Sequence, residues 1–339
     1  MSSFVKLGDL THIRTGKLDA NASSENGQYP FFTCSKEPLR IASYSYDCEC
    51  VLVAGNGDLN VKYYDGKFDA YQRTYIIESA DKRKLLVKYL YFFLDIYVEV
   101  LRTQSIGGVI KYIKLGNLTD ALIPLPSIER QAEIIECLEK CNTLIDKRQR
   151  QIALIEQTVK SRFIELFGDY DLTHPQESWA PIKEVGTVVG GATPKTDHDE
   201  YWGGSYRWIT PAELDADSGY IYDSVRKLTK AGVESCSLQE MPVGTVILSS
   251  RAPIGKVAIA GNTFYCNQGF KNIICKEGIT PRYLYTVLLL NVEYLNSLGR
   301  GATFKEISKG IVESIRIPVP SMELQEQFAA FVEQTDKSK

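Results

Sequence analysis

Two short segments carry residue types that metal-binding and phosphate-binding sites use. Asp197-His-Asp-Glu200 offers carboxylates and an imidazole, which are metal ligands. This run lies between a proline turn and Tyr201-Trp-Gly-Gly204, a setting that favours a solvated loop. Ile254-Gly-Lys256 is similar to the end of a phosphate-binding loop, but the earlier glycine of that motif falls on Ser250 and its Ser or Thr is replaced by Val257. Neither segment predicts catalysis.

Other catalytic and cofactor signatures are missing from the sequence. It has no Asn/Asp/Ser-Pro-Pro-Tyr/Phe methyltransferase motif and no glycine-rich cofactor loop. The eight cysteines form no Cys-x-x-Cys pair, and His12, His174 and His198 complete no zinc pattern. We therefore expect no enzymatic activity, no bound cofactor and no metal site in this chain.

Composition indicates a globular protein of two domains. The 339 residues are 44% hydrophobic and 24% charged, and no apolar run reaches the ~18–20 residues of a membrane helix. The N-terminus lacks the pattern of a secretory signal, and the cysteines are typical of a reducing compartment, so we expect a cytoplasmic protein with no membrane contact.

Charge is nearly balanced along the chain, with a net value of −3. Residues 1–126 and 181–316 each carry 15 Lys and Arg against 14 Asp and Glu, and residues 127–168 carry 7 against 7. A nucleic-acid contact would therefore need a local patch and help from partners. Charge alone leaves DNA binding undecided.

An internal repeat organises the sequence. Ile123-Pro-Leu-Pro-Ser127 recurs as Ile317-Pro-Val-Pro-Ser321 at an offset of 194 residues, and Tyr89-Leu-Tyr91 recurs as Tyr283-Leu-Tyr285 at the same offset. Further upstream the offset is 196, and at the start of each copy it is 175. The chain is a duplicated unit whose second copy has extra residues near its front.

Each copy has the same order of expected elements. An amphipathic start and a glycine turn lead into a strand-and-loop region, a helix around Lys88–Leu101 or Pro281–Leu295, a loop and the Ile-Pro-x-Pro-Ser stop. Because Pro-x-Pro cannot continue a helix or a sheet, we expect an extended hinge there, after which Ser127 or Ser321 caps a new helix.

A long helix is expected after the first hinge. Apolar residues alternate spacings of four and three over more than four heptads, which is typical of a coiled-coil seam, and Gly168 ends the pattern. A helix of about 40 residues is roughly 60 Å long and needs a partner helix for stability. The expected seam residues are Ile134, Leu138, Cys141, Ile145, Ile152, Ile155, Val159 and Leu166.

This organisation resembles the specificity subunit of type I restriction-modification systems. That family has two variable globular units, each followed by a proline hinge and a coiled-coil arm. In the second copy, Gly190-Gly-Ala-Thr-Pro-Lys195, Tyr201-Trp-Gly-Gly204, Trp208-Ile-Thr210 and Asn267-Gln-Gly269 are similar to segments of the family's target-recognition domains. The first copy matches more loosely, since it lacks the Tyr-Trp-Gly-Gly segment.

The resemblance implies an α+β fold with two duplicated α/β target-recognition domains joined by long coiled-coil helices. The expected boundaries are 1–126 and 181–316 for the domains, 127–168 for the central helix, 169–180 for a linker, and 317–339 for the start of a second, truncated helix. Each domain would read one half of a split site in double-stranded DNA, and the helices would dock two methyltransferase subunits. Restriction subunits would complete a complex that uses S-adenosylmethionine, ATP and magnesium.

Loop residues of both copies suit such a reader. Arg or Lys pairs with guanine, Asn or Gln pairs with adenine, and cations and hydroxyl groups bind phosphate. The candidate DNA contacts are Gln72, Arg73, Gln104, Lys111, Ser249, Arg251, Lys256, Asn267, Gln268, Arg300, Thr303 and Lys305. Gln72 and Gln268 recur in both copies and are expected to support loops, so base choice should fall to residues in which the copies differ.

Two alternatives remain at this point: the recognition segment of a fused single-chain restriction-methylation enzyme, and a coiled-coil adaptor that binds no DNA. The helix that follows Ser321 is short, so it is expected to cover only the far half of the first helix, from Ile152 to Leu166. The near half, from Ile134 to Ile145, is then expected to bind a methyltransferase helix or a second copy of the chain.

Overall fold

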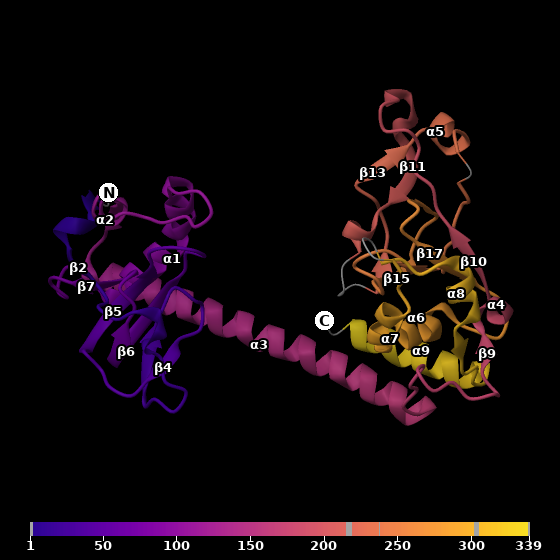
Figure 1. The fold of residues 1–339 in the computed structure, drawn as a ribbon, viewed down its shortest axis with the longest axis horizontal. Helices are drawn as coiled ribbons and strands as arrows, with labels where there is room; N and C mark the ends of the chain where they lie inside the picture. Colours follow the sequence, from indigo (N-terminus) through magenta and orange to yellow (C-terminus); the bar gives the residue numbers. More distant parts are fainter. Residues whose placement is uncertain (1–2, 215–218, 237, 302–304, 338–339) are drawn as a thin grey trace. The chain divides into compact units, whose positions relative to one another are not determined.

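The computed structural model describes residues 3–214, 219–236, 238–301 and 305–337. The chain divides into two units, Met1–Arg148 and Gln149–Lys339, and each unit contains one copy of the repeat. The division falls inside the long helix, because each end of that helix packs against its own unit (Figure 1).

A six-stranded mixed sheet forms the centre of the first unit. Its strands, in spatial order, are β2 (Thr11–Thr15), β7 (Thr74–Ser79), β5 (Tyr46–Ala54), β6 (Val61–Ala70), β3 (Tyr29–Phe32) and β4 (Leu39–Ile41). β3 runs parallel to β6, and the other neighbours are antiparallel. The C-terminal part of β5, residues 50–54, is buried on both faces of the sheet, in agreement with its unbroken run of apolar residues.

Helix α1 (Val87–Gln104) covers one face of this sheet, where Leu90 and Leu94 join Val51 and Val53 in a buried core. Phe32, Phe68 and Ile76 belong to a second buried cluster of the unit. The remaining elements are β1 (Ser3–Lys6), which pairs with β8 (Leu122–Leu125), the short helix α2 (Leu115–Thr119), and the 3-10 turns η1 (Leu7–Asp9) and η2 (Ala20–Ala22).

The second unit repeats this plan with smaller sheets. A five-stranded sheet has the order β10 (Gly186–Gly190), β17 (Lys271–Cys275), β14 (Val246–Leu248), β15 (Val257–Ala260) and β12 (Tyr220–Ile221). A three-stranded sheet has the order β13 (Arg226–Leu228), β11 (Trp202–Ile209) and β16 (Tyr265–Cys266). A third pair joins β18 (Arg316–Ile317) to β9 (Ala180–Pro181), in the same way that β8 joins β1 in the first unit.

Short helices surround these sheets. They are α4 (Ile182–Val185), α5 (Lys230–Glu234), α6 (Pro281–Leu290), α7 (Val292–Ser297), α8 (Lys309–Ser314) and α9 (Met322–Asp336), with the 3-10 turns η3 (Asp199–Tyr201) and η4 (Pro211–Glu213). The single helix expected over Pro281–Leu295 is broken at Asn291, which leaves helical geometry between α6 and α7. Figure 1 places β11, β13 and α5 at the end of this unit away from α6 and α9.

A buried glutamine fixes the hinge of the first copy. The Oε1 atom of Gln131 accepts a hydrogen bond from Leu86 N at 2.9 Å, and its Nε2 atom donates to the carbonyls of Lys84 and Pro126 at 2.8 and 3.0 Å. Gln131 is fully buried, and its one side chain satisfies three backbone groups. The first turn of the long helix is thereby tied to the segment that precedes α1.

The hinge of the second copy has the same construction. Gln325 accepts from Thr280 N at 2.8 Å and donates to the carbonyls of Gly278 and Pro320 at 3.0 and 2.9 Å. The caps differ between the copies, however. Ser127 Oγ accepts from the backbone of the first turn at 3.4 Å, whereas the side chain of Ser321 makes no cap, so the expected cap at Ser321 was wrong.

The expected long helix is α3 (Ile128–Phe167), a continuous helix of 40 residues. Within each unit its buried residues follow a spacing of four: Gln131 and Ile135 in the first unit, and Phe163 and Phe167 in the second. Of the expected seam residues, the half-buried ones are Ile134, Leu138, Ile155, Val159 and Leu166, and the exposed ones are Cys141, Ile145 and Ile152. The observed packing stripe is therefore displaced by one residue from the expected seam at each end of the helix.

Helix α9 packs on the last turns of α3 through aromatic side chains. The ring of Phe163 lies 5.3 Å from that of Phe328 and 5.7 Å from that of Tyr283, and Phe167 lies 4.9 Å from Tyr283. Val159 and Leu166 contact the same core, whereas Ile152 is 39% exposed. The second helix was expected to cover α3 from Ile152 to Leu166. Instead, α9 joins the core of its own unit, and Ile152 is left exposed.

None of the helices in the described ranges combines the length and apolar character needed to cross a membrane.

Candidate nucleic-acid interface

Three segments of the first unit meet through backbone hydrogen bonds: the turn after β5, the β6–β7 turn and the loop between α1 and α2. Gly55 N donates to the carbonyl of Arg73 at 2.8 Å, and Ile113 N donates to the carbonyl of Gly55 at 2.9 Å. The third segment closes on itself, since Ile106 and Tyr112 exchange backbone bonds of 3.0 and 2.9 Å. The loops thus satisfy their own backbone groups, which leaves side chains available for other contacts.

The second unit joins the corresponding segments by the same bonds. Ser250 N donates to the carbonyl of Gly269 at 2.7 Å, and Ile307 N donates to the carbonyl of Ser250 at 2.9 Å. Arg300 and Glu306 exchange backbone bonds of 3.1 and 3.0 Å, as Ile106 and Tyr112 do. The duplication seen in the sequence therefore extends to the hydrogen bonds of the loop backbone.

All four candidate contacts of the first unit are exposed and lie on these segments. Gln72 and Arg73 form the β6–β7 turn, and the turn is held at its backbone, where Gln72 N donates to the carbonyl of Leu18 at 2.9 Å. Gln104 ends α1 and accepts from Asn117 Nδ2 at 3.2 Å. Lys111 accepts from Gly57 N at its carbonyl and has an exposed side chain. The structure brings these residues to neighbouring loops of one unit.

Two candidates of the second unit hold the fold instead of facing solvent. Ser249 is fully buried, its Oγ donates to the carbonyl of Pro253 at 2.7 Å, and it accepts from Lys256 N at 2.9 Å. The prediction that Ser249 contacts DNA was therefore wrong. The half-buried Lys256 donates from Nζ to the carbonyls of Pro211 and Leu214 at 3.3 and 3.0 Å, so its ammonium group fixes the η4 turn.

Asn267 and Gln268 lie at the turn between β16 and β17. Asn267 Oδ1 accepts from Gly269 N at 2.9 Å, which stabilises the turn. The exposed Gln268 accepts a hydrogen bond from the hydroxyl of Thr193. Asn267 thus stabilises its own turn, and Gln268 links this turn to the segment after β10.

Arg251 belongs to a charged cluster centred on Glu306. Arg251 Nε donates to Glu306 Oε2 at 3.0 Å, and Lys271 Nζ lies 3.1 Å from Glu306 Oε1. The Lys271 side chain is largely buried, and it also donates to Ser250 Oγ at 3.4 Å. Burial opposes ionisation of Glu306, but the hydrogen bonds from Lys271 and Arg251 outweigh it and lower the pKa of the carboxyl group. The carboxylate is thus charged at neutral pH.

The other candidates of the second unit lie beside this cluster. Arg300 is exposed, and its backbone pairs with that of Glu306; Lys305 is exposed next to Glu306 in the chain. Thr303 lies outside the described residues. Glu306 and Lys271 are not predictable from residue type alone, because they orient a donor to DNA and are not themselves among the candidate donors.

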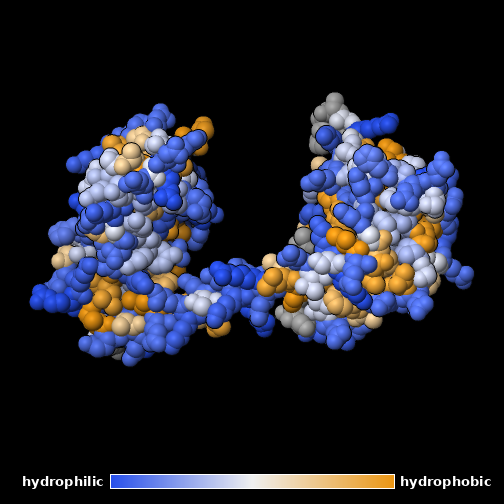
Figure 2. Space-filling model, turned by 90° about the horizontal axis from the view of Figure 1, so that it is seen from below, coloured by the Kyte–Doolittle hydropathy of each residue, from blue (hydrophilic) through white to orange (hydrophobic). Residues whose placement is uncertain are grey.

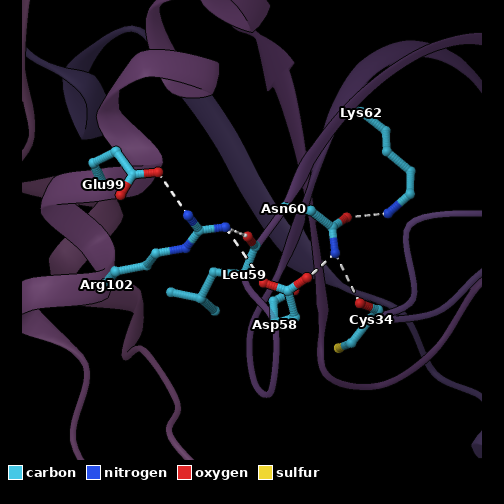
Figure 3. Close-up of polar contacts among 7 residues, drawn as sticks. All are labelled: Cys34, Asp58, Leu59, Asn60, Lys62, Glu99 and Arg102. Carbon is cyan, nitrogen blue, oxygen red and sulfur yellow. Dashed lines mark hydrogen bonds and ion pairs between the residues drawn. The ribbon is translucent and has the colours of Figure 1, made fainter. Parts of the chain in front are cut away.

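A second polar network lies beneath the β5–β6 turn of the first unit (Figure 3). Arg102 donates to the carbonyl of Leu59 at 2.8 Å, to Asp58 at 3.3 Å and to Glu99 at 2.6 Å. Asn60 Nδ2 donates to the carbonyls of Cys34 and Asp58, both at 2.8 Å, and Lys62 bonds the Oδ1 atom of Asn60. These bonds fix the turn that contains Gly55 and Asn56.

The surface chemistry suits polar contacts. The face of each unit in Figure 2 is mainly hydrophilic, with scattered apolar patches. No group of three or more His, Cys, Asp or Glu side chains in the part of the chain that the structure describes is placed to bind a metal ion. In the run Asp197-His-Asp-Glu200, His198 instead contacts Glu200 at 2.8 Å and stacks on Tyr201.

Comparisons with known proteins agree with the repeat. The family model described as the type I restriction modification DNA specificity domain matches residues 2–157 and 177–339. A solved structure of the S subunit of a type I restriction-modification system from M. genitalium aligns over 100% of this chain and 90% of its own, with a TM-score of 0.67 and 15% identity. At that identity the similarity supports the shared fold.

Two curated relatives match part of the chain. It is 42% identical over 184 residues to the type I restriction enzyme MjaIX specificity subunit of Methanocaldococcus jannaschii. That alignment covers 52% of this chain and 42% of the relative. It is 40% identical over 158 residues to the EcoDI specificity subunit of Escherichia coli, which covers 46% of this chain and 34% of the relative. The matches span less than half the length of these relatives. With both copies of its repeat matched by the family model, this α+β chain belongs to the family of type I restriction-modification DNA specificity domains.

Proposed function

We propose that the chain is the DNA sequence-specificity subunit of a type I restriction-modification complex, in which each unit reads one half of a bipartite site. One observation carries the proposal: both units have the same loop backbone, and the side chains on it differ. The exposed Arg73 of the first unit is matched by Gly269 in the second, and the exposed Arg300 of the second unit is matched by Ile106 in the first. Lys111 and Lys305 are equivalent and identical, so they belong to the shared part. Two readers of different half-sites need this combination of a shared frame and different donors.

The proposal assigns catalysis to other subunits. Methyltransferase and restriction subunits would bind S-adenosylmethionine, ATP and magnesium, and the complex would act on DNA in the cytoplasm. Exposed apolar side chains in the middle of α3, namely Leu144, Ile145 and Leu154, support docking of two methyltransferase subunits on this helix. Association of two copies through the same side chains is the competing outcome.

Methylome sequencing of a host that expresses the chain with its methyltransferase subunit tests the proposal. A bipartite methylated motif should appear when the chain is present and be absent when the chain is omitted. A motif that is independent of the chain, or no methylation beyond background when all subunits are present, would contradict the proposal. A gel shift of the assembled complex on the discovered motif would then distinguish a reader from an adaptor that binds no DNA.

A further inference from the structure

Asn56 and Arg251 occupy equivalent points of the two loop frames. Asn56 forms an antiparallel bridge with Tyr112, the residue whose backbone pairs with Ile106. Arg251 forms the same bridge with Glu306, whose backbone pairs with Arg300. The equivalence is hidden in the sequence, because these two positions are 195 residues apart, between the offsets of 194 and 196 that reveal the repeat.

The side chains at this point differ in kind between the units. Where the second unit has Arg251, Glu306, Lys271 and Arg300, the first unit has Asn56, Tyr112, Tyr75 and Ile106. A charged cluster on one frame is thus replaced by an uncharged set on the other. Residues that choose a base should differ between readers of different half-sites, whereas residues that build the frame should recur.

The ion pair leaves Arg251 with the geometry that guanine recognition requires. Its contact with Glu306 uses Nε, so the two terminal nitrogens of a 44% exposed side chain can form a fork toward an external acceptor. Lys271 holds the other oxygen of Glu306, and the exchange of backbone bonds with Arg300 fixes the position of residue 306. A fork held in this way matches the O6 and N7 acceptors of guanine.

Asn56 has a comparable support in the first unit. Gly57 N donates to the carbonyl of Lys111 at 2.9 Å on one side of it, and the network of Arg102 and Asn60 fixes the turn on the other (Figure 3). Asn56 is half-buried, and a carboxamide at such a point offers one donor and one acceptor. Those two groups match the N7 and N6 atoms of adenine.

We propose that Asn56 and Arg251 are the equivalent base-selecting residues of the two units, that Asn56 reads adenine and Arg251 reads guanine, and that Glu306 is the positioning residue that orients Arg251. This inference rests on the proposed function. It adds the base that each unit selects at one position. It also assigns to the Glu306 carboxylate a role that is exerted only through Arg251.

The first test measures base preference with the full chain and its methyltransferase subunits on a library of randomised duplexes. Arg251→Ala should lower the preference for guanine at one position by about 5- to 150-fold and leave the other half-site unchanged. Asn56→Ala should do the same to an adenine in the opposite half-site. Arg251→Lys keeps the charge but not the planar fork, so it should weaken the preference for guanine less than Arg251→Ala does, while the salt dependence of binding is retained.

The second test separates positioning from folding. Glu306→Gln should lower the preference for guanine at the Arg251 position, and DNA affinity for unrelated sequences should be unchanged or higher because a negative charge is removed. In an Arg251→Ala background, Glu306→Gln should have no further effect on base preference. Glu313→Gln is the matched control, since Glu313 also has a side chain 33% exposed and pairs with Lys309 at 3.7 Å in α8. It should leave the motif unchanged.

The outcomes distinguish the inference from the proposed function. If the wild-type complex selects no sequence, the proposed function fails. If it selects a bipartite motif that Arg251→Ala and Asn56→Ala leave intact, or a motif with no guanine and adenine at the affected positions, the assignment of these residues is overturned. If the effects of Glu306→Gln and Arg251→Ala add, Glu306 does not act through Arg251.

Discussion

A single buried glutamine has the same three backbone partners in each unit, and this makes its replacement a sharp test of the hinge. Gln325→Leu keeps the size of the side chain but leaves one N–H and two carbonyl groups without a partner. The free energy of unfolding of the second unit should fall by about 2–4 kcal/mol. The three tryptophans, Trp179, Trp202 and Trp208, all lie in that unit, so their fluorescence during urea unfolding reports it selectively.

Gln131→Leu and Gln157→Leu are the controls for this prediction. Gln131 makes the equivalent bonds in the first unit, so its replacement should leave the tryptophan transition in place while it shifts the far-ultraviolet circular dichroism of the chain. Gln157 is exposed on α3, and its replacement should change stability by less than about 0.5 kcal/mol. Equal effects of all three substitutions on the fluorescence transition would argue against a local hinge.

Sequence could identify residue types at this scale, but not which of them are exposed. Arg73, Lys111 and Arg251 were predicted from their type and lie exposed on the loops, whereas Ser249 was also predicted from its type and is buried. Burial depends on packing between segments that are distant in the chain, and no local pattern records it. Asn56 cannot be matched to Arg251 by the repeat alone, because the turn around it shifts the repeat offset by one residue.

Among the elements, the junction of α3 and α9 is held by a cluster of aromatic rings. Phe163→Ala removes a ring that contacts Phe167, Tyr283 and Phe328, so the second unit should lose about 3–5 kcal/mol of stability. Leu154→Ala on the exposed surface of α3 should change stability by less than about 0.5 kcal/mol. Urea unfolding followed by tryptophan fluorescence measures both, and a similar cost for the two variants would show that the ring cluster does not hold α9.

Labelling of two exposed cysteines on α3 can detect a partner that binds to this helix. Cys137 and Cys141 face solvent, whereas burial raises the pKa of the thiols of Cys266 and Cys275 to about 12. Since the thiolate is the reactive form, iodoacetamide at pH 8 should label Cys137 and Cys141 first. Binding of the methyltransferase subunit should slow that labelling severalfold, as measured by peptide mass spectrometry. Unchanged labelling at saturation would place the docking surface elsewhere, and slowing with chain concentration alone would indicate self-association.

The long helix was predictable because its pattern is local, and its observed ends, Ile128 and Phe167, lie one residue inside the expected 127–168. Its packing stripe was not. A heptad seam assumes a long partner helix, but the ends of α3 pack on globular cores, where a straight helix buries positions four residues apart. The sequence pattern therefore placed Leu166 in the seam, and the structure buries Phe163 and Phe167 instead.

For the whole molecule, the division into two units predicts modular specificity. Replacement of residues 181–316 by the corresponding segment of a relative should change one half of the methylated motif and preserve the other, because each unit has its own core and loop frame. Methylome sequencing of the host measures the result directly. A change in both halves, with the chimera folded and active, would contradict independent readers.

The shared loop backbone has a consequence for how new specificities arise. In both units the three loop segments are joined to one another by backbone hydrogen bonds, so exposed side chains such as Gln72, Arg73 and Lys111 contribute little to joining them. Exchange of an exposed side chain typically changes stability by less than about 0.5 kcal/mol. On the proposed function, mutations at these positions can therefore explore new target sequences while the protein stays folded. The frame makes recognition evolvable, since a change of target need not pass through an unstable intermediate.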